Sequence, residues 1–336
     1  MDLRFSIVVP VYNRPEETRE LLESLASQTC RDPFEVVIVE DGSQKTSEAV
    51  VEAYRDRLTI SYYFKPNTGP GDSRNYGMQR ATGNYFILVD SDCILPPEYL
   101  QQVLEALKKD YLDCFGGPDD AHPSFNALQQ SISFTMTSVL TTGGIRGRKT
   151  SNFQPRSFNM GLSREAFVES QGFGNIHPGE DPDLSLRLLK LGYQLGYIPN
   201  ARVYHKRRID FRSFFRQVYK FGMARPILNR WHPGSARLVY WLPSLFLVFL
   251  LTAAVLPWLW GDKIAWLLPI GVGGYLLAVL IGSGIKSGSI KAALLAPVAL
   301  LVQFTGYGLG FLKSTFLLTF SNKEPEKLLP KLFFHP

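Results

Sequence analysis

The chain has 336 residues, of which 45% are hydrophobic and 20% are charged, and its formal net charge is +6. This length suffices for one large domain or two small ones, with ample apolar residues for a core. The three cysteines, Cys30, Cys93 and Cys114, have no metal-binding or redox spacing. Their odd number argues against a disulfide framework and fits a reducing compartment.

The first hundred residues alternate between strand and helix patterns. Apolar, β-branched runs predict strands at 4–13, 34–43, 59–66 and 85–90. Helices are predicted between them, at 15–29, 46–57 and 71–82. Strands separated by helices imply an α/β fold with a mostly parallel, Rossmann-like sheet, and ligands bind at the carboxyl ends of such strands.

The segment "NYFILVDSDCILPPEYL", residues 84–100, ends an apolar strand in two carboxylates, Asp90 and Asp92. Side chains two residues apart in an extended chain point to the same side, so both could face one ligand. Paired carboxylates suit Mg²⁺ or Mn²⁺ carrying a phosphate. The alternative is that these residues only open the turn that Pro96 and Pro97 continue.

Beyond residue 119 the pattern is looser. Residues 128–140 predict an interfacial helix, and the basic stretch 141–153 predicts a loop that either closes over an anion or links two halves of the domain. The amphipathic segment 208–225 predicts a helix whose phenylalanines enter lipid while its cations meet the headgroups. We therefore expect a membrane-facing part after the α/β domain.

Three nearly uncharged runs near 240–260, 264–285 and 292–312 are long enough to cross about 30 Å of hydrocarbon. Nine basic residues and one acid between 202 and 230 precede them, which favours anionic lipid as a partner and argues against nucleic acid. The run "FSIVVPVY" is too short for a signal peptide. The expected location is thus the inner cell membrane, multi-pass, with the α/β domain in the cytoplasm.

These features divide the chain into four parts: a catalytic domain at 1–204, a basic juxtamembrane segment at 205–239, a transmembrane region at 240–320 and a tail at 321–336. Three crossings place the tail outside. If the third run is re-entrant instead, the tail returns to the cytoplasm and could touch the catalytic domain.

Seven motifs occur in an order and spacing that resemble the family 2 inverting glycosyltransferases, which have the GT-A fold. They are "IVVPVYNR" (7–14), "VVIVEDGS" (36–43), "NTGPGDSRNYG" (67–77), "LVDSD" (88–92), "FNMGLSREAF" (158–167), "GF" (172–173) and "GEDPDLSLRLLKLGY" (179–193). The resemblance covers roughly residues 4–222. It implies a nucleotide diphosphosugar as donor, with UDP expected first and GDP or dTDP as alternatives.

The resemblance also assigns donor-binding residues. Pro10, Val11 and Tyr12 would line the base pocket, and Asp41 would hold the base or ribose. Arg74 would contact the diphosphate. The "DSD" motif would contribute Asp90 and Ser91 to ribose or metal and Asp92 to the Mg²⁺ or Mn²⁺ that neutralises the leaving group. The pair Glu40–Asp41 departs from the more common Asp-Asp of the family.

By the same resemblance, Asp181 is the base that takes the proton of the acceptor hydroxyl, and Glu180 supports it. Asp183 is expected to cap the following helix, whose Leu184, Leu188 and Leu191 form a core stripe. His205 is either a third metal ligand or an ordinary surface histidine. Asn159 and Met160 lie either beside the acceptor or in the core.

These observations predict a membrane-anchored, metal-dependent hexosyltransferase that acts on a glycan or lipid-linked acceptor in envelope synthesis. One alternative is a transferase to polyprenyl phosphate, whose anionic acceptor needs no base. Another is an inactive scaffold or transporter subunit, although Asp90, Asp92 and Asp181 are all retained.

Overall fold

A computed structural model describes residues 2–120, 122, 125–143, 153–206, 210–261 and 263–334. Of the basic stretch 141–153, for which we predicted a loop that either closes over an anion or links two halves of the domain, residues 144–152 lie outside the described residues. The chain divides into two compact units. We call residues 1–122, 145–206 and 333–336 the sheet unit, and residues 123–144 and 207–332 the helical unit.

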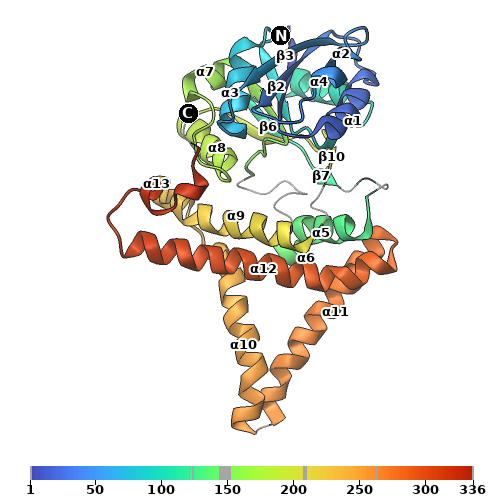
Figure 1. Ribbon diagram of the computed structural model, residues 1–336. Coiled ribbons are helices and arrows are strands. Elements are labelled where there is room, and N and C mark those ends of the chain that lie inside the picture. Colours follow the sequence, from blue (N-terminus) through green and yellow to red (C-terminus); the bar gives the residue numbers. More distant parts are fainter. Residues whose placement is uncertain are drawn as a thin grey trace. The chain divides into compact units, whose positions relative to one another are not determined.

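The sheet unit is built on seven strands in the order β3-β2-β1-β4-β8-β6-β9 (Figure 1). Their bounds are β1 Phe5–Val11, β2 Phe34–Asp41, β3 Thr59–Lys65, β4 Tyr85–Val89, β6 Cys114–Gly116, β8 Asn159–Ser163 and β9 Leu195–Tyr197. The first four of these in sheet order are parallel, while β8 runs antiparallel to both β4 and β6. The predicted α/β class with a mostly parallel sheet is confirmed.

Both faces of this sheet are covered by apolar cores (Figure 1). Along β1, Ile7 and Val9 join one core and Val8 joins the other, because successive side chains of a strand point to opposite faces. This burial on both faces explains the continuous apolar runs of the parallel strands. The helices of the unit are α1 Pro15–Ala26, α2 Glu48–Glu52, α3 Pro70–Arg80, α4 Tyr99–Lys109, α7 Arg164–Ser170 and α8 Glu180–Lys190.

A second, three-stranded sheet lies beyond the carboxyl end of β4. It consists of β5 (Cys93–Ile94), β10 (Val203–His205) and β7 (Asp119–Asp120), in the order β5-β10-β7. His205 pairs with Cys93 in the antiparallel β5–β10 ladder. This pairing carries a segment more than a hundred residues away in sequence to the "DSD" motif.

The helical unit contains three helices that are long and apolar enough to cross a membrane, within Leu238–Trp260, Lys263–Ser287 and Ile290–Thr319. In the most apolar 18-residue stretch of each helix, 11% is buried within the protein for the first two helices and 44% for the third. The helices are α5 Ala127–Thr137, α6 Val139–Thr142, α9 Phe211–Trp231, α10 Leu242–Trp260, α11 Leu267–Ser287, α12 Ile290–Thr319 and α13 Pro325–Leu328. Short 3₁₀ turns are η1 Pro233–Ser235, η2 Leu238–Trp241, η3 Lys263–Trp266 and η4 Pro330–Leu332.

Within the helical unit, α9 and α12 run side by side (Figure 1). Glycines allow their backbones to meet: a Cβ added at Gly222 of α9 would lie 2.1 Å from the carbonyl oxygen of Tyr307, and one added at Gly310 of α12 would lie 2.2 Å from that of Tyr219. Close contact through small residues is a common mode of helix association in membranes.

The apolar face of α9 lies against protein where we expected lipid. Phe214 and Val218 are buried in a cluster with Ile132 and Met136 of α5 and Ala299 of α12. The sequence correctly predicted an amphipathic helix, but the expectation that this face enters lipid is wrong for these two residues. The long helix α12 covers it instead.

The chain returns to the sheet unit after the last helix. Phe333 forms an isolated antiparallel bridge with Ile176, and the backbone N–H of Phe334 donates to the carbonyl oxygen of Asn175 at 3.0 Å. Residues 333–334 therefore lie against the loop that precedes α8.

Candidate functional site

The acidic residues that follow β4 lie beside a histidine and an arginine. Asp92 has a side chain that is 12% exposed, and its Oδ1 lies 3.2 Å from Nε2 of His205. Its Oδ2 accepts a hydrogen bond from the guanidinium of Arg14. Burial raises the pKa of the Asp92 carboxyl, but His205 and Arg14 outweigh it and hold this pKa well below its usual range. Asp92 is therefore an anion at any physiological pH.

The residues around Asp92 fit a divalent cation. One ligand atom each of Asp92, Cys93 and His205 lies within 4.8 Å of the others. Asp92 Oδ1 is buried and accepts no hydrogen bond within the described part of the chain. Burial raises the pKa of the Cys93 thiol well above its usual value, so a carboxylate oxygen and an imidazole nitrogen are the suitable ligands.

Asp119 is a residue of this cluster that the sequence analysis missed. Its carboxylate Oδ2 lies 3.9 Å from Nδ1 of His205, on the side of the ring opposite Asp92. A carboxylate behind a histidine orients the ring and raises its basicity toward a metal. The signal in sequence was the acidic pair Asp119–Asp120 after an apolar run, but only the pairing of β7 with β10 brings it to His205.

Arg74 connects the "DSD" motif to the "GED" motif. Its side chain is buried, with Nη2 2.5 Å from Oδ1 of Asp90 and Nη1 3.7 Å from Oε1 of Glu180. Nε and Nη1 of Arg74 donate no hydrogen bond to any described residue. A buried guanidinium with spare donors suits a doubly charged diphosphate. Asp90 faces Arg74 and does not belong to the group of metal-ligand atoms around Asp92.

The two acids at the start of α8 have different pKa values because their surroundings differ. Burial raises the pKa of Glu180, but His177, whose Nδ1 lies 2.8 Å away, and Arg74 lower it to about 2. For Asp181, burial and the neighbouring charge of Glu180 raise the pKa above its usual value. Oδ1 of Asp181 is buried and accepts no hydrogen bond from the described residues. Asp181 is thus the more basic carboxylate of the pair.

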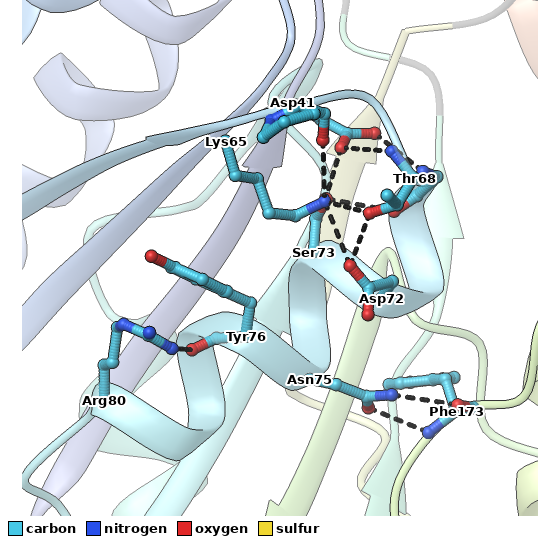
Figure 2. Close-up of polar contacts among 11 residues, drawn as sticks. Asp41, Lys65, Thr68, Asp72, Ser73, Asn75, Tyr76, Arg80 and Phe173 are labelled. Carbon is cyan, nitrogen blue, oxygen red and sulfur yellow. Dashed lines mark hydrogen bonds and ion pairs between the residues drawn. The ribbon is translucent and has the colours of Figure 1, made fainter. Parts of the chain in front are cut away.

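Asp41, the predicted base- or ribose-binding residue, is fully engaged by the protein (Figure 2). Its Oδ1 accepts from Nζ of Lys65 at 2.7 Å and from the N–H of Thr68 at 3.0 Å, and its Oδ2 accepts from the N–H of Gly69 at 3.0 Å. Lys65 also lies 3.0 Å from Asp72. Asp41 therefore fixes the turn that leads into α3.

Figure 2 also shows the neighbouring residue Asn75 facing Phe173. Asn75 exchanges two hydrogen bonds with the backbone of Phe173, of 2.9 and 2.8 Å. These bonds tie α3 to the loop before α8. Asn75 therefore has a structural role.

The departure at Glu40 from the family pattern has a structural explanation. Its carboxylate accepts hydrogen bonds from the hydroxyl of Ser43, from the N–H of Ser47 at 2.8 Å and from the hydroxyl of Tyr62 at 3.3 Å. Glu40 is fully buried. Its longer side chain holds the loop after β2 in place.

Several predicted contacts with donor or acceptor are not supported. Val11 is buried in the core, whereas Tyr12 is 52% exposed and available to a ligand. Asn159 is 1% exposed and bonded to the hydroxyl of Tyr99 and to backbone carbonyls, and Met160 is fully buried. Core packing, the alternative for Asn159 and Met160, thus replaces the acceptor role.

The remaining predicted positions differ in accessibility. Ser91 is only 5% exposed, whereas Pro10, close to Tyr12 in sequence, is partly exposed. Asp183 does not cap α8, which begins at Glu180. Its Oδ2 accepts from Nε of Arg187 at 2.9 Å.

Comparison with known proteins relates the first half of the chain, which carries Arg74, Asp90 and Asp92, to one family. Residues 6–170 match the family model described as Glycosyl transferase family 2. Over 137 residues the chain is 36% identical to validoxylamine A glucosyltransferase of Streptomyces hygroscopicus subsp. jinggangensis, covering 38% of this chain and 32% of that relative. Over 114 residues it is 35% identical to the poly(ribitol-phosphate) beta-N-acetylglucosaminyltransferase TarS of Staphylococcus aureus, covering 33% of this chain and 20% of TarS.

The chain thus spans about a third or less of the length of these relatives. Among solved structures, the mannosyltransferase PcManGT from Pyrobaculum calidifontis, in complex with GDP-Man and Mn²⁺, matches 90% of this chain and 88% of its own. The TM-score is 0.62 at 17% identity. This likeness shows a shared GT-A fold.

Proposed function

Because the chain belongs, through residues 6–170, to family 2 of the glycosyl transferases, we propose that it transfers a sugar from a nucleotide diphosphosugar to a hydroxyl group of a membrane-associated glycan or lipid. The observation that carries this proposal is the position of Arg74 between Asp90 and Glu180. It joins a candidate metal and donor site to a candidate base. The activity belongs to synthesis of an envelope polysaccharide or glycolipid.

In this mechanism Asp181 takes the proton of the acceptor hydroxyl as the new C–O bond forms at the anomeric carbon. The bond from that carbon to the diphosphate breaks on the opposite face, which inverts the configuration. Arg74 contacts the departing diphosphate with its spare N–H donors. Asp92 and His205 would hold Mg²⁺ or Mn²⁺, which supplies further neutralisation of the leaving group. Glu180 keeps Arg74 and His177 in place.

The donor is proposed to be a UDP-sugar, with GDP- and dTDP-sugars as alternatives. PcManGT was solved with GDP-Man and Mn²⁺, and TarS is named for transfer of N-acetylglucosamine.

The protein is proposed to lie in the inner membrane with the sheet unit in the cytoplasm. Residues on both sides of the helical unit, up to 206 and from 333, belong to the sheet unit. A chain that leaves a folded unit and returns to it crosses a membrane an even number of times. The little-buried helices α10 and α11 are the best pair for two crossings, and α12, the most buried of the three apolar helices, does not cross. The basic residues before α10 favour a cytoplasmic start.

The proposed base can be tested by comparing two aspartates of one motif. Asp181→Asn should leave binding of the nucleotide sugar unchanged and lower transfer by about 10²–10⁴-fold, the usual contribution of a positioned base. The experiment screens detergent-purified protein against UDP-, GDP- and dTDP-sugars and then measures turnover with the sugar that is used. Asp183→Asn is the matched control. Asp183 contacts Arg187, so this variant should retain turnover.

Near-normal turnover of Asp181→Asn would exclude Asp181 as the base. With a polyprenyl phosphate acceptor, full turnover of this variant would favour the alternative in which an anionic acceptor needs no base. The absence of turnover with every sugar in the wild-type protein would contradict the enzymatic proposal and favour a scaffold.

A further inference from the structure

The short segment Phe333–Phe334 contacts two loops of the candidate site. Phe333 is 8% exposed and bridges Ile176, which is 1% exposed. The backbone of Phe334 is bonded to Asn175 at 3.0 Å, and its ring centroid lies 6.0 Å from that of His177. His177 is the partner of Glu180. One contact of the segment is therefore with the loop that leads into α8, whose first turn carries the proposed base.

The second contact is with the glycine turn before α3. A Cβ added at Gly69 would lie 2.5 Å from Cδ2 of Phe334, so the ring occupies the space of a side chain at this position. Gly69 has a φ of +94°, which favours glycine independently. Its N–H is also bonded to Asp41. The ring of Phe334 thus lies directly on the turn that Asp41 fixes.

These two loops are already close to each other near the segment. A Cβ added at Gly71 in α3 would lie 3.1 Å from the carbonyl oxygen of Gly174 and 3.2 Å from Cβ of Phe173. Three residues further along α3, Arg74 reaches Glu180. A shift of either loop would therefore change the distance between the donor residues and the base.

We propose that Phe334 is a positioning residue for sugar transfer, which holds the loop of His177, and with it the first turn of α8 that carries Glu180 and Asp181, against the turn at Gly69. This inference rests on the proposed function. Phe334 acts through its neighbours and touches no reacting atom. Its effect follows from geometry, since a displacement of about 1 Å at a reacting group can cost up to about 10²-fold in rate.

The test compares three variants of the full chain in detergent or nanodiscs. Phe334→Ala removes the ring, and Phe334→Tyr restores it with a hydroxyl at the partly exposed edge. Phe320→Ala is the matched control, because Phe320 is 75% exposed and its ring lies against that of Phe316, within the helical unit. Two quantities are measured: hydrogen exchange of the peptide that covers 175–181, and kcat and KM for the nucleotide sugar.

We expect Phe334→Ala to speed exchange in 175–181 and to lower kcat about tenfold, with KM for the donor changed less than about threefold. Phe334→Tyr and Phe320→Ala should resemble the wild type in both. Unchanged exchange in Phe334→Ala would overturn the contact. Faster exchange with unchanged kcat would show that the contact stabilises the loop but does not affect transfer. A rise in kcat would show that the segment inhibits transfer. Either result overturns the proposal.

Failure of the proposed function has a different signature. If the wild type uses no nucleotide sugar, the role of Phe334 in transfer fails with it. The exchange data still decide whether the segment holds the loop.

Discussion

At Asp92, an arginine and a histidine face the two oxygens of one carboxylate. Arg14 contacts Oδ2, and His205 lies beside Oδ1. The side chain of Arg14 is 31% exposed, so it can move away at little cost. A divalent ion that binds Asp92 through both oxygens has to displace this guanidinium. Arg14 therefore competes with the metal before the donor arrives.

Replacement of Arg14 should strengthen metal binding. We expect Arg14→Met to raise the affinity for Mn²⁺ by up to about fivefold without nucleotide, since a partly exposed ion pair contributes up to about 1 kcal/mol. The measurement is Mn²⁺ binding followed by electron paramagnetic resonance. Arg19→Met is the control, because Arg19 is half-exposed and pairs with Glu16. Equal or weaker binding of Mn²⁺ by Arg14→Met would refute the competition.

The unequal acids of α8 predict a pH effect. Activity requires the ionised form of Asp181, so turnover should fall as the pH drops through its pKa, which burial and Glu180 raise. Glu180→Gln removes the neighbouring negative charge and lowers this pKa. The acidic limb of the kcat profile should therefore move to lower pH. A limb that stays in place, or moves to higher pH, would show that Glu180 does not act on the base.

At the scale of elements, the contact between α9 and α12 depends on the absence of side chains at three glycines. Gly222, Gly306 and Gly310 each face backbone or side-chain atoms of the other helix at less than 3 Å from an added Cβ. Since the apolar face of α9 is buried here, a wider separation of the helices would expose Phe214 and Val218.

A methyl group at this contact should destabilise the helical unit. Gly310→Ala is expected to lower the midpoint of thermal unfolding by several degrees, because overpacking costs about 1–3 kcal/mol. Gly274→Ala in α11 is the matched control, since no described atom lies within 4 Å of its added Cβ. Thermal unfolding of both variants is compared in the same detergent. A midpoint equal to that of the control would contradict close packing of α9 on α12.

The elements with long periodic patterns were predictable, and the site was predictable only in part. Buried parallel strands such as β1 and β2 give apolar runs that sequence alone reveals. Strands of two or three residues, such as β5, β7 and β10, are too short to show a period. The sequence therefore left the role of His205 beside Asp92 open and did not reveal Asp119. The predicted core stripe of α8 is confirmed for Leu184 and Leu188, which are buried. Leu191 is 45% exposed, because the helix ends at Lys190.

At the scale of the whole molecule, the return of the chain to the sheet unit limits its membrane topology. From composition alone, the three apolar helices suggested three membrane crossings and a tail outside the cell. Contacts of residues 333–334 with 175–176 favour the other arrangement that the sequence left open, with the tail on the same side as Ser43. Composition could not reveal this, because a helix buried by other helices and one buried in lipid have similar sequences.

Cysteine labelling in intact cells tests this topology. With Cys30 replaced by serine, cysteines placed at Ser43 and at Ser321 should both be protected from an impermeant reagent, whereas one at Gly261, between α10 and α11, should react. All three should react after permeabilisation, which is the control for accessibility. Labelling at Ser321 in intact cells would restore three crossings, and labelling at Ser43 would exclude access to cytosolic nucleotide sugars.

The position of Phe333 and Phe334 in the chain also has a consequence for biosynthesis. Domains generally fold as units while the chain is synthesised, the earlier parts first. The sheet unit, however, includes residues that follow all the apolar helices in sequence. A nascent chain can form its main sheet soon after residue 206, but the loop before α8 gains its last contacts only after α10, α11 and α12 have been synthesised. Formation of the complete site would then be coupled to membrane insertion, and chains stalled in the translocon would lack transferase activity.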